Sequence, residues 1–285
     1  MKPRICIIGT GEIAKYHVPA INEAGFQIVS CCGSPGSLKA PLFAKKHNIP
    51  KVFKDVDSLI SDSDNWDAVL ICSSLETTLQ ILKKCIVIGK PILVEKPITT
   101  TPDDFLSLSK KLKNVFVAYN RRFYSTIQYA KKFIEENNPC YLKMELPESI
   151  DFSDSNISNK FFNVRYNSVH GLDLLNYLLP SIKLVKVERH IQPDMAFSKS
   201  AYFKTPRGDS AQVFLNWNSP SNFSLSIDAI PFRLELKPFE SYSLFKGMDV
   251  VEPSENYPIR QYVPKLIRTE NVFHDSKEFK PGFLE

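Results

Sequence analysis

A glycine-rich turn near the start of the chain constrains its fold more than any other feature. Residues 5–8 form an apolar run typical of a buried strand, which leads directly into the pattern Gly9-x-Gly11-x-x-Ala14. Residues 15–24 then favour a helix. Gly9 permits a tight turn, Gly11 lets the backbone approach a ligand, and Ala14 lets the helix pack close to the strand. Because the N–H groups that begin such a helix bind phosphate, the pattern predicts a dinucleotide site.

The rest of the first half repeats short apolar runs separated by helical segments. Strands are expected at residues 5–8, 27–32, 68–72, 92–94 and 115–118. Helices are expected between them, notably at 75–88 and 102–112. Short apolar strands that alternate with helices predict a parallel sheet covered on both faces. We therefore expect a doubly wound α/β domain over residues 1–119, with its ligand beyond the carboxyl ends of the strands.

The second half of the chain has a different periodicity. Polar and apolar residues alternate over three segments, 211–217, 225–229 and 232–236. This alternation is typical of antiparallel strands with one buried face. Helices at 125–136 and about 168–179 precede these strands, and residues 247–283 are expected to form an extended arm. The prediction is an α+β domain over residues 120–285 with a largely antiparallel sheet.

Composition limits the classes of partner. The chain of 285 residues has a formal net charge of +5 and no dense run of Lys and Arg, so nucleic acid is not an expected partner. No apolar run approaches the ~20 residues of a membrane span, and the pattern of a secretory signal is missing. The six cysteines form no CxxC pair, which predicts reduced core thiols, no metal site and a cytoplasmic location.

Two residues are candidates for chemistry. Lys96 stands in a Glu-Lys-Pro sequence at the carboxyl end of the expected strand 92–94, where a lysine can hydrogen-bond a substrate hydroxyl and stabilise an alkoxide. His170 lies three residues before Asp173 on an expected helix, and the near-neutral pKa of a histidine suits a proton acceptor. Each also has a structural interpretation, as a charged loop residue for Lys96 and a core histidine for His170.

Four motifs, taken in order, resemble those of one protein family. They are Gly9-x-Gly11-x-x-Ala14, Glu95-Lys96-Pro97, Tyr119-Asn120-Arg121-Arg122-Phe123 and His170-x-x-Asp173. The chain resembles the Gfo/Idh/MocA family, the relatives of glucose–fructose oxidoreductase and inositol dehydrogenase, from its first residue to about residue 285. The segments Asn120-Arg121-Arg122-Phe123 and Asn167-Ser168-Val169-His170 are most similar to those of members found with nucleotide-sugar and surface-polysaccharide genes. The resemblance implies a Rossmann fold and the transfer of hydride between NAD or NADP and a hydroxyl or keto group of a sugar or nucleotide sugar.

The resemblance also implies roles for individual residues. Lys96 would orient the hydroxyl, and His170 would take its proton as hydride leaves for the nicotinamide. Cofactor contacts are expected from Gly9, Thr10, Gly11, Glu12, Ile13, Ser34, Ser37, Lys39, Ser73, Glu95, Lys96 and Asn120. Contacts with the sugar are expected from Arg121, Tyr124, Arg165, Tyr166, Asn167 and Asp173. Asn120 and Arg121 are equally compatible with a structural role.

Tyr166 departs from the family pattern. Many members carry an aspartate four residues before the histidine, where it orients the imidazole, and here Asn167 or Asp173 is the expected substitute. Loss of an orienting carboxylate lowers the rate by about 10⁴-fold in the serine-protease triad. Two interpretations therefore stay open: a sugar or nucleotide-sugar oxidoreductase, or a catalytically weak or silent dinucleotide-binding protein that serves as a sensor or partner subunit.

The loop after the second expected strand bears on the choice of cofactor. NAD sites place an acidic residue there for the ribose 2′-hydroxyl. This chain has Ser34 and Ser37 followed by Lys39. The two serines leave room for a 2′-phosphate and the lysine can pair with it, so NADP is slightly favoured while NAD stays open.

The expected sheet of the second domain leaves one face open. In the resembling family this face commonly makes the dimer or tetramer contact. The candidates for it here are Tyr202, Phe203, Phe214 and Trp217, although most of them are also compatible with a core position. A homo-oligomer that acts on a small-molecule sugar is therefore expected.

Overall fold

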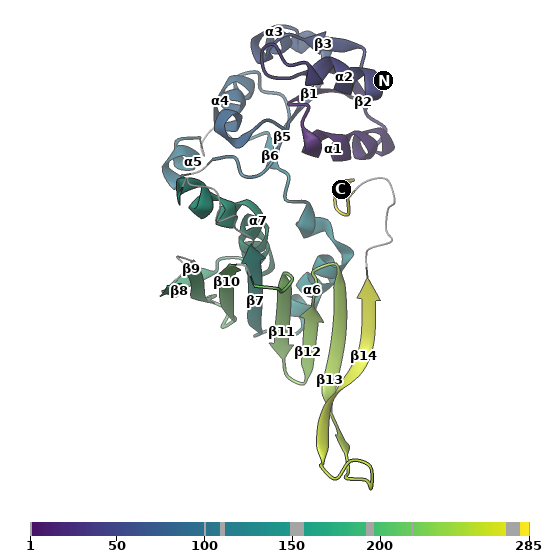
Figure 1. Cartoon of the computed structure of the whole chain (residues 1–285), viewed down its shortest axis with the longest axis vertical. Helices are drawn as coiled ribbons and strands as arrows, with labels where there is room; N and C mark the ends of the chain where they lie inside the picture. Colours follow the sequence, from purple (N-terminus) through teal and green to yellow (C-terminus); the bar gives the residue numbers. More distant parts are fainter. Residues whose placement is uncertain are drawn as a thin grey trace. The chain divides into compact units, whose positions relative to one another are not determined.

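The chain folds into two compact units in the computed structural model (Figure 1). The structure describes residues 2–99, 101–108, 112–148, 157–191, 197–217, 219–271 and 280–284. The first unit comprises Met1–Asn120 with Ser276–Glu285, and the second comprises Arg121–Asp275. The division thus falls between residues 120 and 121, and the C-terminal segment groups with the first unit.

The first unit is a parallel six-stranded sheet of order β3-β2-β1-β4-β5-β6. Its strands are β1 (Arg4–Ile8), β2 (Gln27–Cys32), β3 (Lys51–Phe53), β4 (Ala68–Ile71), β5 (Ile92–Val94) and β6 (Val115–Val117). Its helices are α1 (Glu12–Glu23), α2 (Lys39–Lys46), α3 (Val56–Ser61), η1 (Ser63–Asn65), α4 (Leu75–Ile86) and α5 (Pro102–Leu108). The strand order reverses between β1 and β4, which confirms the predicted doubly wound Rossmann sheet. The pattern missed β3, because three residues at an exposed sheet edge show no periodicity.

Separate apolar clusters cover the two faces of this sheet. Within β1, Ile5 and Ile7 point into the cluster that contains Ala14 of α1, whereas Cys6 and Ile8 point into the opposite cluster. This alternation is that of a strand buried on both faces, as a central parallel strand must be. The first strand therefore places the glycine turn on a rigid support.

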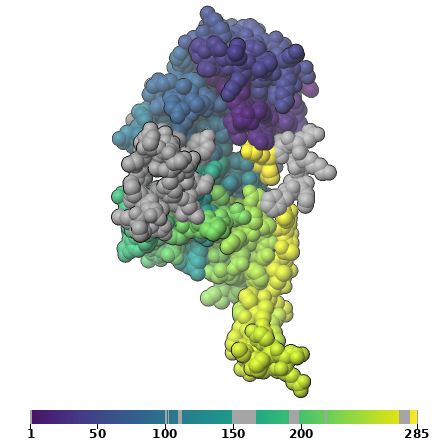
Figure 2. Space-filling model, in the orientation of Figure 1, coloured from purple at the N-terminus to yellow at the C-terminus, as the bar shows by residue number. Residues whose placement is uncertain are grey.

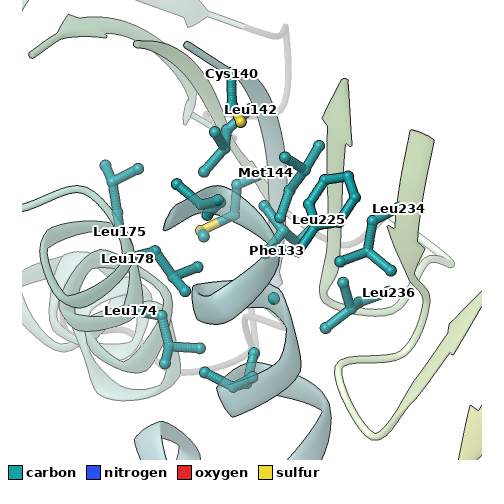
Figure 3. Close-up of a cluster of buried hydrophobic side chains, with 14 of the residues drawn as sticks. Phe133, Cys140, Leu142, Met144, Leu174, Leu175, Leu178, Leu225, Leu234 and Leu236 are labelled. Atoms are coloured by element: carbon teal, nitrogen blue, oxygen red, sulfur yellow. The ribbon is translucent and has the colours of Figure 1, made fainter. Parts of the chain in front are cut away.

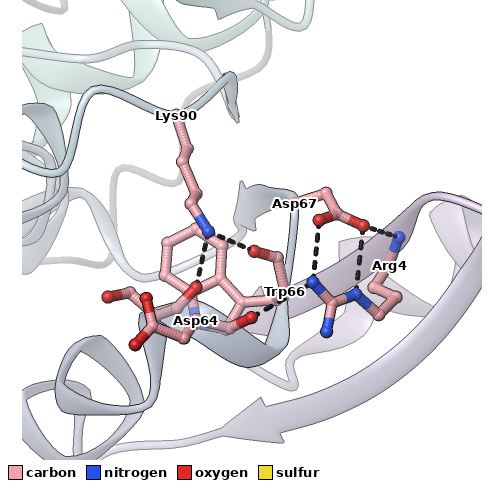
Figure 4. Close-up of polar contacts among 6 residues, drawn as sticks. Arg4, Asp64, Trp66, Asp67 and Lys90 are labelled. Carbon is pink, nitrogen blue, oxygen red and sulfur yellow. Dashed lines mark hydrogen bonds and ion pairs between the residues drawn. The ribbon is translucent and has the colours of Figure 1, made fainter.

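A polar network braces the amino-terminal end of the sheet (Figure 4). The Arg4 backbone N–H, Nε and Nη2 donate to the Asp67 carboxylate over 2.8–3.2 Å, and the side-chain bond from Arg4 lowers the pKa of Asp67 to about 2. Lys90 Nζ donates to the carbonyl oxygens of Ser63 and Trp66, both at 2.6 Å, and lies 5.0 Å from the centroid of the Trp66 ring. These contacts lie at the edge opposite the glycine turn, so they stabilise the unit without occupying the end where a ligand is expected.

The second unit is built on an eight-stranded sheet of order β14-β13-β12-β11-β7-β10-β9-β8. Its strands are β7 (Tyr141–Glu148), β8 (Lys183–Ile191), β9 (Phe197–Lys204), β10 (Ser210–Trp217), β11 (Ser224–Ala229), β12 (Phe232–Leu236), β13 (Ser241–Val251) and β14 (Gln261–Asn271). Its helices are α6 (Ser125–Glu136) and α7 (Ile157–Leu178), after the turn η3 (Asn120–Phe123). Within the described residues of this second unit, only the β7–β10 pair is parallel, which confirms the predicted α+β unit.

Two predicted elements of this unit differ from the structure, and strands β7, β8 and β9 were not predicted. Helix α7 begins at Ile157 and not near residue 168, because no Gly or Pro interrupts the chain between the two positions. The predicted arm over residues 247–283 contains most of a long hairpin, β13–β14, whose tip extends past the end of β12 (Figures 1 and 2).

The core of the second unit lies between its sheet and its two helices (Figure 3). Strand β7 contributes Leu142 and Met144 at alternate positions, and α7 contributes Leu174, Leu175 and Leu178 at helical spacing. The two periodicities meet in one buried cluster, in which Phe133 of α6 and the leucines of β11 and β12 complete the packing.

Gly171 lies where α7 packs closely against β7. A Cβ at this position would lie 2.2 Å from Cδ2 and 2.6 Å from Cδ1 of Leu146, whose side chain is fully buried. We expect Gly171→Ala to lower the free energy of unfolding by about 1–3 kcal/mol, since Leu146 or the helix must move. Urea unfolding measures this, with Leu172→Ala, at a residue of α7 that is 43% exposed, as the control. Equal midpoints for Gly171→Ala and the wild type would contradict the packing argument.

Candidate functional site

Gly9 forms the turn between β1 and α1 at the carboxyl edge of the sheet. Its φ is +94°, and a Cβ there would lie 2.4 Å from the carbonyl oxygen of Cys72. Its N–H donates to the carbonyl oxygen of Cys32 at 2.9 Å. The turn therefore lies directly on the chain that leaves β2 and β4, and only glycine combines this φ with this approach.

Gly11 has the opposite surroundings. A Cβ on Gly11 would meet no atom within 4 Å, and this residue, at the N-cap position of α1, has no side chain with which to cap the helix. Of its neighbours, Glu12 is exposed while Thr10 and Ile13 are half-buried. An uncapped helix start beside open space has the shape and the N–H donors that a pyrophosphate requires, so these residues fit a dinucleotide.

Polar residues follow β4 and β5 at the same edge of the sheet. Strands β1, β4 and β5 are neighbours, so Gly9, Ser73 and Glu95 leave the carboxyl ends of adjacent strands. Ser73 Oγ lies 2.9 Å from Oγ1 of the buried Thr78 in the first turn of α4. The strand order reverses at β1 and β4, which is where doubly wound sheets bind their ligands.

The loop between β2 and α2 forms a turn near the start of α1. The Ser37 N–H donates to the carbonyl oxygen of Ser34 at 2.9 Å, and the Lys39 N–H donates to Ser37 Oγ at 3.3 Å. The pKa of Glu12 is lowered by its hydrogen bond with Lys15 and further by the charges of Lys39 and Lys46. Lysine side chains from α1 and α2 therefore place positive charge at the helix start.

His17 is a residue of this unit that the sequence patterns missed. It lies on the buried face of α1, 4% exposed, and its Nε2 is 2.6 Å from Glu95 Oε1. Because an ionised carboxylate only accepts hydrogen bonds, Nε2 donates to Glu95. The sequence signal that places His17 on the buried face of α1 is its spacing. It lies three residues after Ala14 and one before Val18, which are both buried on that face.

The residues predicted at the end of the first unit have other partners. Asn120 Nδ2 donates to the carbonyl oxygen of Pro281 at 2.9 Å. In the second unit, the Arg121 guanidinium lies 4.6 Å from the centroid of the Phe223 ring, and Tyr124 is buried in the core cluster. These contacts provide a structural role for each of the three residues.

His170 is buried on α7, in a turn that Glu148 fixes. Glu148 Oε1 accepts from the Asn167 N–H at 2.9 Å, from the Ser168 N–H, and from Ser168 Oγ at 2.9 Å. Glu148 is itself buried at the end of β7, on the face that Leu146 shares. The sequence signal for this contact is a charged residue at a buried position of an alternating strand, which none of the predicted motifs includes.

Asp173 is held by Arg122 within the second unit. Arg122 Nε donates to Asp173 Oδ2 at 2.7 Å, and Nη2 donates to Oδ1. Burial raises the pKa of Asp173, and the hydrogen bonds from Arg122 oppose this rise. Both carboxylate oxygens of the expected orienting group are thus engaged by an arginine, while the Asn167 side chain is exposed. The predicted side chains of Arg165 and Tyr166 lie outside the residues whose side chains are described.

Replacement of Arg122 by methionine is expected to destabilise the second unit by about 1–3 kcal/mol at neutral pH, because it leaves a carboxylate buried and unpaired. The Asp173 side chain is 8% exposed. Since its pKa is raised in the folded state, the folded protein binds this proton more readily than the unfolded chain, and stability falls as pH rises above the ordinary pKa of Asp. The loss of unfolding free energy in Arg122→Met, relative to the wild type, should therefore become smaller toward pH 4. Urea unfolding at several pH values measures it.

The control for this experiment is the double variant Arg122→Met/Asp173→Leu. It removes the carboxylate together with its partner, so the pH-dependent part of the deficit should disappear. A deficit in Arg122→Met that stays constant across pH would contradict the assignment to Asp173.

Several other kinds of site are missing from the described part of the chain. No helix there is long and apolar enough to cross a membrane, and no three His, Cys, Asp or Glu side chains are grouped to hold a metal ion. All six cysteines are buried free thiols, and burial raises the pKa of Cys31 to about 11 and that of Cys85 to about 12.

The reversed strand order, the Gly9 turn and the uncapped start of α1 define a Rossmann-type dinucleotide-binding protein. Residues 3–119 match the oxidoreductase family with an NAD-binding Rossmann fold. This nucleotide-binding unit belongs to the Gfo/Idh/MocA oxidoreductase family, which confirms the predicted resemblance.

Relatives of known activity match part of the chain. Myo-inositol 2-dehydrogenase of Thermotoga maritima is 28% identical over 187 residues, which make up 62% of this chain and 54% of that enzyme. The chain spans about half to two thirds of the length of the curated relatives that it matches.

Solved structures share the fold over most of the chain. An oxidoreductase from Agrobacterium radiobacter in complex with NAD⁺, L-tartaric acid and magnesium has a TM-score of 0.71 at 15% identity, covering 94% of this chain and 81% of that one. UDP-N-acetylglucosamine 3-dehydrogenase from Acidithiobacillus ferrooxidans has a TM-score of 0.70 at 18% identity, covering 94% and 84%. At these identities the likeness shows the fold alone.

Proposed function

We propose that the protein is an NAD(P)-dependent oxidoreductase that transfers hydride between the nicotinamide and a hydroxyl or keto group of a sugar or nucleotide sugar. The observation that carries this proposal is the Gly9–Gly11 turn at the carboxyl edge of a sheet whose strand β5 is followed directly by Glu95 and Lys96. Relatives named as inositol dehydrogenases support a polyhydroxylated substrate.

The proposal assigns a task to each part of the site. When bound, the nicotinamide cofactor supplies the hydride acceptor or donor. The start of α1 holds the pyrophosphate, the turn at Ser34 and Ser37 faces the adenosine ribose, and Ser73, Glu95 and Asn120 contact the nicotinamide half. Lys96 orients the substrate hydroxyl and stabilises the developing alkoxide, and His170 accepts its proton. The sugar contacts are assigned to Arg121, Tyr124, Arg165, Tyr166, Asn167 and Asp173.

For the cofactor we propose NADP, with NAD as the alternative. The support is Lys39, whose charge reaches the start of α1 together with that of Lys46.

In a fluorescence titration we expect NADPH to bind more tightly than NADH. Lys39→Ala should lower the affinity for NADPH only about two- to five-fold, since an exposed ion pair contributes little free energy. The affinity for NADH should not change. The control is Lys51→Ala, whose Nζ pairs with Asp62 at 2.9 Å. Tighter binding of NADH, or an equal effect of Lys39→Ala on both, would contradict the choice of NADP.

Turnover decides whether the protein is an enzyme. The purified chain is incubated with cofactor and a panel of inositols, aldoses and UDP-sugars, and NAD(P)H absorbance is followed in both directions. Oxidation or reduction of any panel member supports the proposal. The second candidate function is a weak or silent dinucleotide-binding protein. It is favoured by the engagement of Asp173 with Arg122, and saturable cofactor binding with no turnover would establish it.

We also propose a cytoplasmic homo-oligomer. Six buried free thiols fit a reducing compartment. On the sheet of the second unit, Phe203 packs partly against the core, whereas Phe214 alternates with the buried Val213 and so faces the other side. The side chain of Trp217 lies outside the description, and Tyr202 is half-buried. Sedimentation velocity tests the proposal, and a monomer at all concentrations would contradict it.

A further inference from the structure

The C-terminal residues of the first unit lie against α1 (Figure 2). Phe283 stacks on His17, with the ring centroids 4.5 Å apart and the rings inclined by 27°. Lys280 Nζ lies 4.1 Å from the centroid of the Tyr16 ring. Two consecutive residues of α1 thus contact one short segment from the other end of the chain.

The same segment is tied to the end of the first unit. Asn120 Nδ2 donates to the carbonyl oxygen of Pro281, as described above. A turn follows, in which Gly282 has a φ of +72° and the Phe283 N–H donates to the carbonyl oxygen of Lys280 at 3.2 Å. The turn directs the Phe283 ring onto His17, so residues 280–284, which we call the C-terminal clasp, are held on both sides.

His17 connects this clasp to the Glu-Lys-Pro loop. One face of its ring contacts Phe283, and its Nε2 donates to Glu95 Oε1 at 2.6 Å. The second oxygen of that carboxylate, Oε2, accepts the Lys96 N–H at 3.3 Å. Glu95 is 12% exposed, so these bonds are largely shielded from water. A continuous set of contacts therefore runs from Phe283 through His17 and Glu95 to the backbone of Lys96.

We propose that His17 and Phe283 are positioning residues for Lys96. The clasp fixes the His17 ring, His17 fixes the Glu95 carboxylate, and Glu95 holds the backbone from which the Lys96 side chain projects. The effect on turnover rests on the function proposed above, whereas the effect on the order of the loop does not. The C-terminal residues of the chain are on this basis part of the site, although about 190 positions separate them from Lys96.

Amide exchange at Lys96 tests the proposal without cofactor or turnover. The rate is measured by NMR on the full chain for the wild type, Phe283→Ala and Phe283→Trp. Phe283→Ala should raise the rate about two- to tenfold, the range that corresponds to one aromatic stack, and Phe283→Trp should restore it. The matched control is Phe116→Ala on β6 of the same unit, 62% exposed, which should leave the rate unchanged. An unchanged rate in Phe283→Ala overturns the proposal.

A double-variant cycle tests whether the clasp acts through His17. If it does, His17→Ala/Phe283→Ala raises the exchange rate no more than His17→Ala alone, and His17→Gln, which keeps a donor for Glu95, recovers part of the protection. Additive effects would overturn the proposed order of contacts. The unfolding midpoint of each variant is measured alongside. If the exchange rates of all amides rise together with the loss of global stability, the proposal is also overturned.

Kinetics then separates this inference from the proposed function. In an active wild type, Phe283→Ala should lower kcat about two- to tenfold with little change in the KM for cofactor. A wild type without turnover contradicts the dehydrogenase function, and the exchange rates at Lys96 still decide whether the clasp positions the loop.

Discussion

Gly9→Ala should abolish nucleotide binding and strongly destabilise the first unit. The added Cβ would lie 2.4 Å from the Cys72 carbonyl oxygen and 2.7 Å from the Ser73 nitrogen, and both are backbone atoms of the chain leaving β4. No side-chain rotation can relieve such a clash, and the φ of +94° is disfavoured for alanine. We expect a loss of about 2–5 kcal/mol in the free energy of unfolding.

Gly11→Ala is the matched control for this prediction. Its Cβ meets no atom within 4 Å and its φ is −78°, so the free energy of unfolding should change by less than about 1 kcal/mol. The same Cβ would occupy the space assigned to the pyrophosphate, so the affinity for NADPH should fall about tenfold or more. Urea unfolding and fluorescence titration of both variants separate the two roles. If Gly9→Ala unfolds at the same urea midpoint as the wild type, the turn can relax around the added Cβ, and glycine is not needed at this position.

Lys96→Ala should lower kcat by about 10²–10⁴-fold, the range typical of a group that stabilises charge or transfers protons in the transition state. The affinity for cofactor should change much less, because the start of α1 provides most of its binding in the proposed arrangement. Steady-state kinetics with the best substrate of the panel measures kcat, and a fluorescence titration measures the affinity.

The control for Lys96 is Lys84→Ala in the same unit. Lys84 is 49% exposed and its Nζ pairs with Asp57 at 2.6 Å, so its loss should leave kcat unchanged. If Lys96→Ala keeps kcat within about threefold of the wild type, Lys96 has no part in the chemistry. If Lys96→Ala is inactive and His170→Ala is fully active, the proton is accepted elsewhere.

The parts of the site that sequence patterns located are those that depend on neighbours along the chain. The Gly9–Gly11 turn follows from a strand, a required φ and a helix start within a few residues, and the structure shows the crowding at Gly9 and the open space at Gly11. The parallel sheet follows in the same way from the spacing of apolar runs. Both can be read from local periodicity, because the backbone geometry that they need is local.

Contacts between distant residues could not be located in this way. The bond from His17 to Glu95 spans 78 positions, and the pair of Arg122 and Asp173 spans 51. Asn167 or Asp173 was expected to orient His170, and Asp173 lies three residues after it on the same helix. In the structure the Asp173 carboxylate accepts hydrogen bonds from Arg122. A charge buried beside the core requires a cationic partner, and the turn before α6 provides this arginine.

By itself, the sequence determined the two folds, the glycine turn and the family that the nucleotide-binding unit matches, since each of these is encoded in short patterns of size, polarity and backbone freedom. Only the tertiary structure decided which charged and aromatic side chains meet: His17 with Glu95 and Phe283, and Glu148 with the turn before His170. A residue type states which bonds a side chain can make, but its partner is the group that packing brings within about 3 Å of it.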